Sequence, residues 1–125
     1  MTIAYWTVLT AILLPIIFAG TAKFGRSDYD NREPRRWLDA LDGWRRRANA
    51  AQSNSHEAIA PFAAAVIIAH AANAPQTAID TLAIAYIGFR ILYGVLYIAD
   101  LHLLRSLAWL AAMACVIGLF IVAAV

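Results

Sequence analysis

Four long apolar runs limit what this chain can fold into. A membrane-spanning helix needs about 20 consecutive apolar residues, and runs of roughly that length cover 2–22, 54–73, 78–99 and 103–125. The sequence has 125 residues, of which 62% are hydrophobic and 14% charged. A soluble domain of this size could not bury so much apolar surface. We therefore predict an all-α integral membrane protein, a four-helix bundle forming a single domain over 1–125.

The basic residues are concentrated between the first two runs. Eight of the ten Lys and Arg residues lie between Lys23 and Arg47, within an expected loop over 23–53, and the turn at 73–77 has none. This asymmetry predicts a cytoplasmic first loop with both termini outside, and it indicates a membrane anchor rather than a nucleic-acid surface. Because basic residues follow the first run and do not precede it, we expect that run to be retained rather than cleaved.

Several polar or reactive residues have structural interpretations. Trp37 and Trp44 in the loop suit the headgroup region, with a substrate lid as the alternative. Asp80, three residues after Thr77, fits a helix-capping pattern, and Cys115 lies in an apolar run that predicts core packing. The three histidines are too dispersed to predict a metal site.

The third run contains a charged residue deep inside it. Arg90, Tyr93 and Tyr97 are spaced i, i+3 and i+7, which places them on one helical stripe. A charge near the middle of a bilayer costs about 2.5 to 3.5 kcal/mol on insertion scales. We therefore expect Arg90 to face the bundle interior and to pair with Glu57, either as a structural ion pair or as part of a binding site. Ordinary aromatic packing is the alternative for the two tyrosines.

The second run begins with polar residues that have two interpretations. Asn54 and Glu57 share a helix face with Pro61, and together they can line a polar pocket between helices. Asn54 as N-cap with Glu57 three residues later is also a capping arrangement at a helix start. The alanines before Asn54 allow the helix to begin earlier.

The stretches "RANAAQSNSHEAIAPF", "RILYGVLY" and "RSLAW", in this order with four spans and a basic first loop, resemble the MAPEG family. These are membrane-associated proteins in eicosanoid and glutathione metabolism, and the likeness is greatest to bacterial members. The resemblance implies a homotrimer in the bacterial inner membrane, with glutathione as cosubstrate in the cytoplasmic half between subunits. It also implies transfer to, or peroxidase action on, a lipophilic small molecule that arrives through the membrane lipids.

The resemblance also implies roles for individual residues. Arg105 and Ser106 match the catalytic pair beside the glutathione sulfur, where positive charge favours the thiolate and the serine donates a hydrogen bond. The matches to glutathione-binding positions are Asn54, Glu57, Arg90, Tyr93, Tyr97, Lys23 and Arg47. Arginine at such positions can grip the two carboxylates of glutathione.

The sequence departs from the family pattern at several positions. Glutathione-using members commonly have basic residues just before the asparagine, where this chain has 50–53, "AAQS". Tyr93 stands where histidine is frequent, and Trp109 stands where some members have an aromatic hydroxyl. These departures favour an alternative, a non-catalytic binder of a lipid or anionic metabolite in the same pocket. A small multidrug exporter is a further alternative, but the first run lacks the embedded glutamate of that family.

Overall fold

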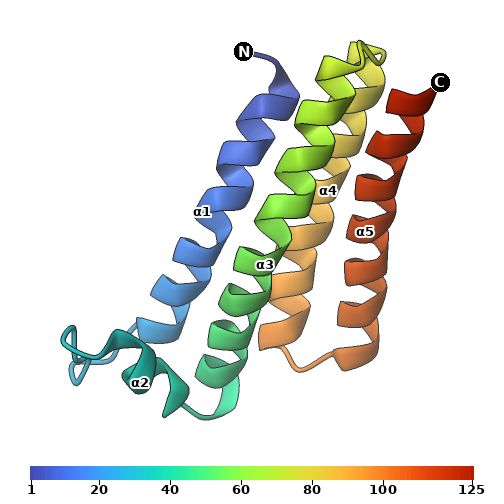
Figure 1. The fold of residues 1–125 in the computed structure, drawn as a ribbon. Helices are drawn as coiled ribbons and strands as arrows, with labels where there is room; N and C mark the ends of the chain where they lie inside the picture. Colours follow the sequence, from blue (N-terminus) through green and yellow to red (C-terminus); the bar gives the residue numbers. More distant parts are fainter.

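The computed structural model describes all 125 residues and consists of five helices without strands (Figure 1). The helices are α1 (Ile3–Lys23), α2 (Pro34–Asp39), α3 (Gly43–Ala71), α4 (Gln76–Ile98) and α5 (His102–Ala124). The four long helices run side by side, and short α2 lies at one end of the bundle. Both chain termini lie at the opposite end, as expected for an even number of long helices (Figure 1).

The core is formed where α3 and α4 pack against each other and against both outer helices. α1 and α5 each contact α3 and α4. The largest fully buried side chains include Phe62 and Val66 from α3, Ile79 from α4 and Leu119 from α5. Polar side chains that α3 and α4 direct inward are therefore surrounded by other helices on several sides.

The outer surface of the bundle is apolar. Only 27 of the 125 residues are buried, and large apolar side chains such as Ile16, Leu103, Leu107 and Ile121 are more than half exposed. In water this surface would be strongly unfavourable, whereas lipid or a partner subunit can cover it. This arrangement agrees with the predicted all-α membrane protein.

Three helices, α1, α4 and α5, are long and apolar enough to cross a membrane. The sequence predicted four such spans, so the expectation for α3 is not confirmed. The reason is that the apolar part of α3, between Ala58 and Ala69, is too short, because the polar residues Asn54, His56 and Glu57 precede it and His70 follows it.

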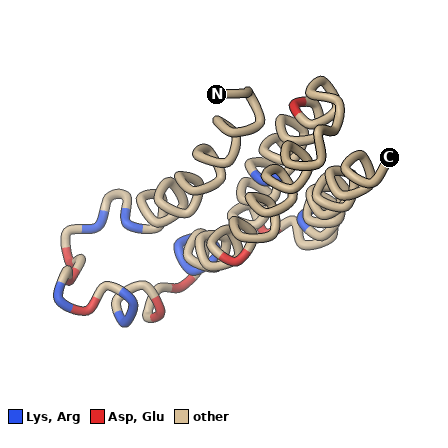
Figure 2. Tube along the Cα trace, turned by 45° about the horizontal axis from the view of Figure 1, so that its top comes forward, with Lys and Arg blue, Asp and Glu red and all other residues tan.

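α3 begins well before the apolar run 54–73 from which this helix was predicted. Its first residue is Gly43, so Asn54 and Glu57 lie inside the helix and the capping interpretation of this pair is wrong. The expected loop over 23–53 likewise contains α2 and the first turns of α3. Figure 2 shows that Lys, Arg, Asp and Glu gather at this end of the bundle.

In the remaining loop Arg26 binds Asp28 through two hydrogen bonds, of 2.8 and 2.6 Å, and this lowers the pKa of Asp28 to about 2.

The turns after α3 and α4 have the same geometry. Asn73 and Asp100 adopt left-handed backbone angles, with φ of 57° and 63°. Ala74 N–H donates to Ala69 and Leu101 N–H donates to Leu96, which is the bond pattern of a Schellman motif. Asn and Asp tolerate this conformation better than most residues, so the sequence itself specifies where both helices end.

The side chain of Asp80 on α4 is hydrogen-bonded to the N-terminus of α1. Its Oδ1 accepts hydrogen bonds from the backbone N–H of Ala4 at 2.8 Å and from Gln76 Nε2 at 2.9 Å. α4 has no side-chain cap, so the predicted Thr77 and Asp80 cap is wrong, although Asp80 is structural as expected. Beside it, His70 stacks on Tyr5 with ring centroids 4.1 Å apart.

Replacing Asp80 with alanine should lower the free energy of unfolding by about 2 kcal/mol, because a charged acceptor of two hydrogen bonds is lost. Thermal or chemical unfolding in detergent measures this change. Asp39→Ala, at an exposed α2 position without a hydrogen-bond partner, is the matched control and should leave stability unchanged. Equal stability of the two variants would show that Asp80 does not hold α1 in place.

Gly94 permits the close approach of α1 to α4. A Cβ at this position would overlap the ring of Phe18, whereas a Cβ at Gly88 on the same helix would meet nothing within 4 Å. We therefore expect opposite effects on thermal stability. Gly94→Ala should destabilise by about 1 to 3 kcal/mol through overpacking, and Gly88→Ala should stabilise by about 0.5 to 1 kcal/mol. Adding Phe18→Leu to Gly94→Ala should restore part of the loss, and no restoration would count against this contact.

Candidate functional site

Arg90 is the buried charge around which the site is organised. It lies in α4 with 2% of its surface exposed, as expected for a guanidinium that faces the bundle interior. Its Nη2 donates to Asn54 Oδ1 at 2.9 Å and to Ser55 Oγ at 3.1 Å, both on α3. The predicted ion pair with Glu57 is wrong, since the chain contains only two salt bridges and neither involves Arg90. Ser55 and Asn54 contact Arg90 instead because α3 turns Ser55 toward the bundle interior, where it is 3% exposed, and leaves Glu57 exposed.

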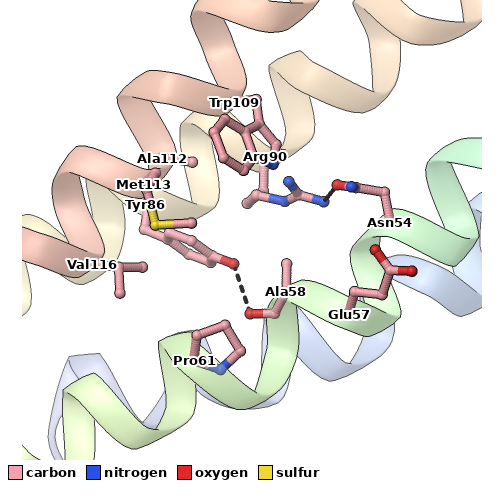
Figure 3. Close-up of a pocket in the computed structure, with 10 residues that line it drawn as sticks. All are labelled: Asn54, Glu57, Ala58, Pro61, Tyr86, Arg90, Trp109, Ala112, Met113 and Val116. Carbon is pink, nitrogen blue, oxygen red and sulfur yellow. Dashed lines mark hydrogen bonds between the residues drawn. The ribbon is translucent and has the colours of Figure 1, made fainter.

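A cavity opens beside Arg90 between α3, α4 and α5 (Figure 3). Its volume is about 150 Å³. The polar end consists of Asn54, Glu57 and Arg90, and the lining beyond it is formed by Ala58, Pro61, Tyr86, Trp109, Ala112, Met113 and Val116. The pocket expected from Asn54, Glu57 and Pro61 on one helix face is therefore present, with an apolar interior.

A ladder of cations and aromatic rings runs from Arg90 to the start of α5. The Arg90 guanidinium lies 4.5 Å from the centre of the Tyr93 ring. Tyr93 and Tyr97 meet edge to face with centroids 5.7 Å apart, and Arg105 lies 4.2 Å from the Tyr97 ring. The predicted stripe on α4 thus begins at the buried guanidinium of Arg90 and is continued by the partly exposed guanidinium of Arg105 on α5. We call these four residues the cation–aromatic ladder.

A second, shallower cleft lies at the Arg105 end of the ladder. It has a volume of about 380 Å³ and is lined by Tyr93, Tyr97, Arg105, Ser106, Trp109 and Leu110. Ser106 is exposed, and its Oγ donates to the backbone carbonyl of His102 at 3.0 Å. The hydroxyl oxygen is therefore accessible from the cleft and can exchange this bond for one to a ligand.

Trp109 separates the two spaces, because it lines both the cavity and the cleft. In Figure 3 its indole lies above the Arg90 guanidinium. Within one chain, Arg90, Asn54 and Glu57 are thus on one side of the indole and Arg105 and Ser106 on the other. Apart from Lys23 and Arg47, the expected site residues form two neighbouring groups that the ladder connects.

Comparison with protein-family models places this geometry in context. The model of the MAPEG family matches residues 3–125, nearly the whole chain. The chain belongs to the MAPEG family. It matches no curated protein and no solved structure.

Two basic residues implied by the MAPEG resemblance lie outside both spaces. Arg47 Nε donates to the backbone carbonyl of Ile98 at 3.0 Å, so it satisfies an orphan acceptor at the end of α4. Lys23, at the end of α1, lies 4.2 Å from the Tyr29 ring. In a single MAPEG chain these two cations therefore have local partners and do not complete the site.

Two residues of the candidate site were not identified from the sequence. Ser55 is 3% exposed and accepts from Arg90. Tyr86 lines the cavity, donates to the Ala58 carbonyl at 3.2 Å and stacks on Phe62 with centroids 3.8 Å apart. Tyr86 lies four residues before Arg90, so extending the polar stripe by one turn toward the N-terminus would have found it.

Proposed function

We propose that this protein is a trimeric, glutathione-dependent transferase or peroxidase of the membrane, acting on lipophilic electrophiles or hydroperoxides. Membership of the MAPEG family supports the class of protein. The observation that carries the proposal is the cation–aromatic ladder, which holds Arg90 and Arg105 at opposite ends of two tyrosines that meet edge to face.

A ladder with two cationic ends suits a ligand with several negative groups. Glutathione has two carboxylates, and its sulfur becomes a third anion when the thiol ionises. In our proposal Arg90 and Asn54 bind the carboxylate at the γ-glutamyl end of the peptide, Glu57 binds the ammonium group beside that carboxylate, and Arg105 lies near the sulfur. The charge of Arg105 favours the thiolate, and Ser106 supplies a hydrogen bond to it.

The proposed conjugation is a displacement at the acceptor. The thiolate attacks an electrophilic carbon, a carbon–sulfur bond forms, and the leaving group departs with the bonding electrons. With a hydroperoxide, the thiolate attacks the terminal oxygen and an alcohol leaves after protonation. A second glutathione then reduces the sulfenic acid to give the disulfide and water.

A second subunit is needed to complete this site. The cleft at Arg105 is open at the surface of one chain, and Lys23 and Arg47 have no place in it. Exposed apolar side chains on the neighbouring helices, such as Leu103, Leu107 and Leu110, suit coverage by another copy or by lipid. We propose a homotrimer in a bacterial inner membrane with α2 on the cytoplasmic side.

Activity in detergent tests the proposal directly. The purified protein should conjugate glutathione to 1-chloro-2,4-dinitrobenzene, measured by absorbance, or reduce cumene hydroperoxide in a coupled assay. It should also show a thermal shift with millimolar glutathione. If the protein shows neither turnover nor a thermal shift, the transferase and peroxidase proposals lose their support. Light scattering corrected for detergent tests the trimer separately.

A non-catalytic binder is the second candidate. The stretch 50–53 lacks the basic residues common in glutathione-using relatives, and Arg47 is already bonded to Ile98. Fewer cations would then contact the glutathione carboxylates. A ligand-dependent thermal shift without turnover would favour this candidate.

A further inference from the structure

We propose that the cavity between α3, α4 and α5 binds a small, neutral aromatic compound within one subunit, with a hydrogen-bond acceptor on the ring directed at Arg90. This binding goes beyond the proposed function, because it needs neither glutathione nor a second copy of the chain. Three features carry the proposal: the size of the cavity, its wall and the unused donors of Arg90.

The volume sets the size of the ligand. Pockets for drug-sized molecules usually measure about 300 to 1,000 Å³, whereas this cavity measures about 150 Å³. An apolar protein cavity of about 150 Å³ is known to accept benzene. A single ring fills this volume, whereas a complete tripeptide or a long acyl chain would extend beyond it.

The wall favours a flat ring. Tyr86 and Trp109 contribute aromatic surfaces from α4 and α5, and Pro61 adds a rigid apolar ring from α3. Tyr86 is held in place by its stack on Phe62 and its bond to Ala58, so its position is fixed before a ligand enters. Met113 is the adaptable part, since a thioether adjusts its shape and contacts aromatic rings favourably.

The polar end selects for a neutral acceptor. Both hydrogen bonds of Arg90 to the protein come from Nη2, so Nε and Nη1 have no protein acceptor although the residue is almost fully buried. These two donors are not fully enclosed, because Arg90 lines the cavity, so a ligand there can accept hydrogen bonds from them. Glu57 lines the same cavity and opposes an anion that carries no positive charge of its own, whereas a neutral carbonyl oxygen can accept from Arg90 without that repulsion. An aryl ketone combines the ring with the acceptor.

Fluorine NMR with 4-fluoroacetophenone tests the proposal on the whole protein in detergent, without glutathione. The probe signal should broaden saturably relative to empty micelles, and unlabelled acetophenone should reverse the broadening. 4-Fluorotoluene, which lacks the acceptor, should bind about tenfold more weakly after correction for micelle partition, because one hydrogen bond to a charged donor is lost.

Variants on opposite walls locate the binding. Ala112→Leu on α5 and Ala58→Leu on α3 fill the cavity and should each weaken probe binding at least tenfold. Ala114→Leu adds the same side chain at an exposed α5 position and should bind as the wild type does. Circular dichroism checks the helical content of each variant, and either cavity variant suffices if the other does not fold.

The outcomes separate this proposal from the proposed function. Saturable binding that both cavity variants abolish supports it even in a protein without glutathione activity. Probe broadening no greater than in empty micelles overturns it, and so does equal binding by the wild type and the cavity variants. If neither cavity variant folds, equal affinities for 4-fluoroacetophenone and 4-fluorotoluene overturn the role of Arg90.

Discussion

Arg105→Ala is expected to lower kcat/KM for glutathione conjugation about 100-fold at pH 7, the effect typical of removing one preorganised electrostatic group at a reacting anion. Arg105 lies 4.2 Å from the Tyr97 ring and lines the cleft beside Ser106. A nearby positive charge lowers the pKa of the bound glutathione thiol, so its removal raises that pKa. The rising limb of the rate profile should therefore move to higher pH, and the loss should be greater at pH 6.5 than at pH 8.5.

The matched control is Arg46→Ala, an exposed arginine in the first turns of α3 that lines neither space. It should leave both kcat/KM and the pH profile unchanged. A loss for Arg105→Ala that is equal at every pH would assign the residue to substrate binding alone. An unchanged kcat/KM for Arg105→Ala would show that Arg105 is not part of the site.

Arg90→Met is expected to separate stability from binding. Replacing a buried charge by an apolar side chain of similar size is often neutral or stabilising, because the desolvation penalty disappears. Here the loss of two hydrogen bonds, to Asn54 and Ser55, partly offsets that gain. The melting temperature in detergent should therefore remain the same or rise. The affinity for glutathione should fall about 100-fold, the scale of losing one buried charge partner.

Thermal unfolding and isothermal titration with glutathione measure the two quantities on the same preparation. Arg90→Lys tests the geometry, because lysine keeps the charge and loses the planar fork of donors. It should bind glutathione more weakly than the wild type and more strongly than Arg90→Met. A lower melting temperature with unchanged affinity would make Arg90 a structural residue only.

The stripe on α4 illustrates how far helical spacing predicts the site. Arg90, Tyr93 and Tyr97 were placed on one face from their spacing, and the structure brings them into one ladder. The prediction succeeded because residues three and four apart on one helix are neighbours regardless of the tertiary fold. Glu57 failed as the partner because its distance from Arg90 depends on how α3 sits against α4, which spacing along either helix does not specify.

The start of α3 could not be located from the hydropathy of the sequence. Hydropathy identified only the apolar second half, because the first half carries Arg45, Arg46 and Arg47 and extends beyond the apolar region. Charged helices give no apolar run, although arginine and alanine are good helix formers. A helix cap was therefore one of the two interpretations of Asn54, whereas Asn54 lies inside the helix as an acceptor for Arg90.

Local sequence patterns were sufficient to predict the apolar helices, the ends of α3 and α4, the basic end of the bundle and the polar stripe on α4. These features depend on residues close together along the chain, whose transfer energies and backbone preferences act locally. The tertiary structure alone decided that Asn54 and Ser55 rather than Glu57 contact Arg90, that Asp80 holds α1, and that Trp109 separates two spaces. These contacts join different helices, so they depend on the register and rotation that side-chain packing sets between them.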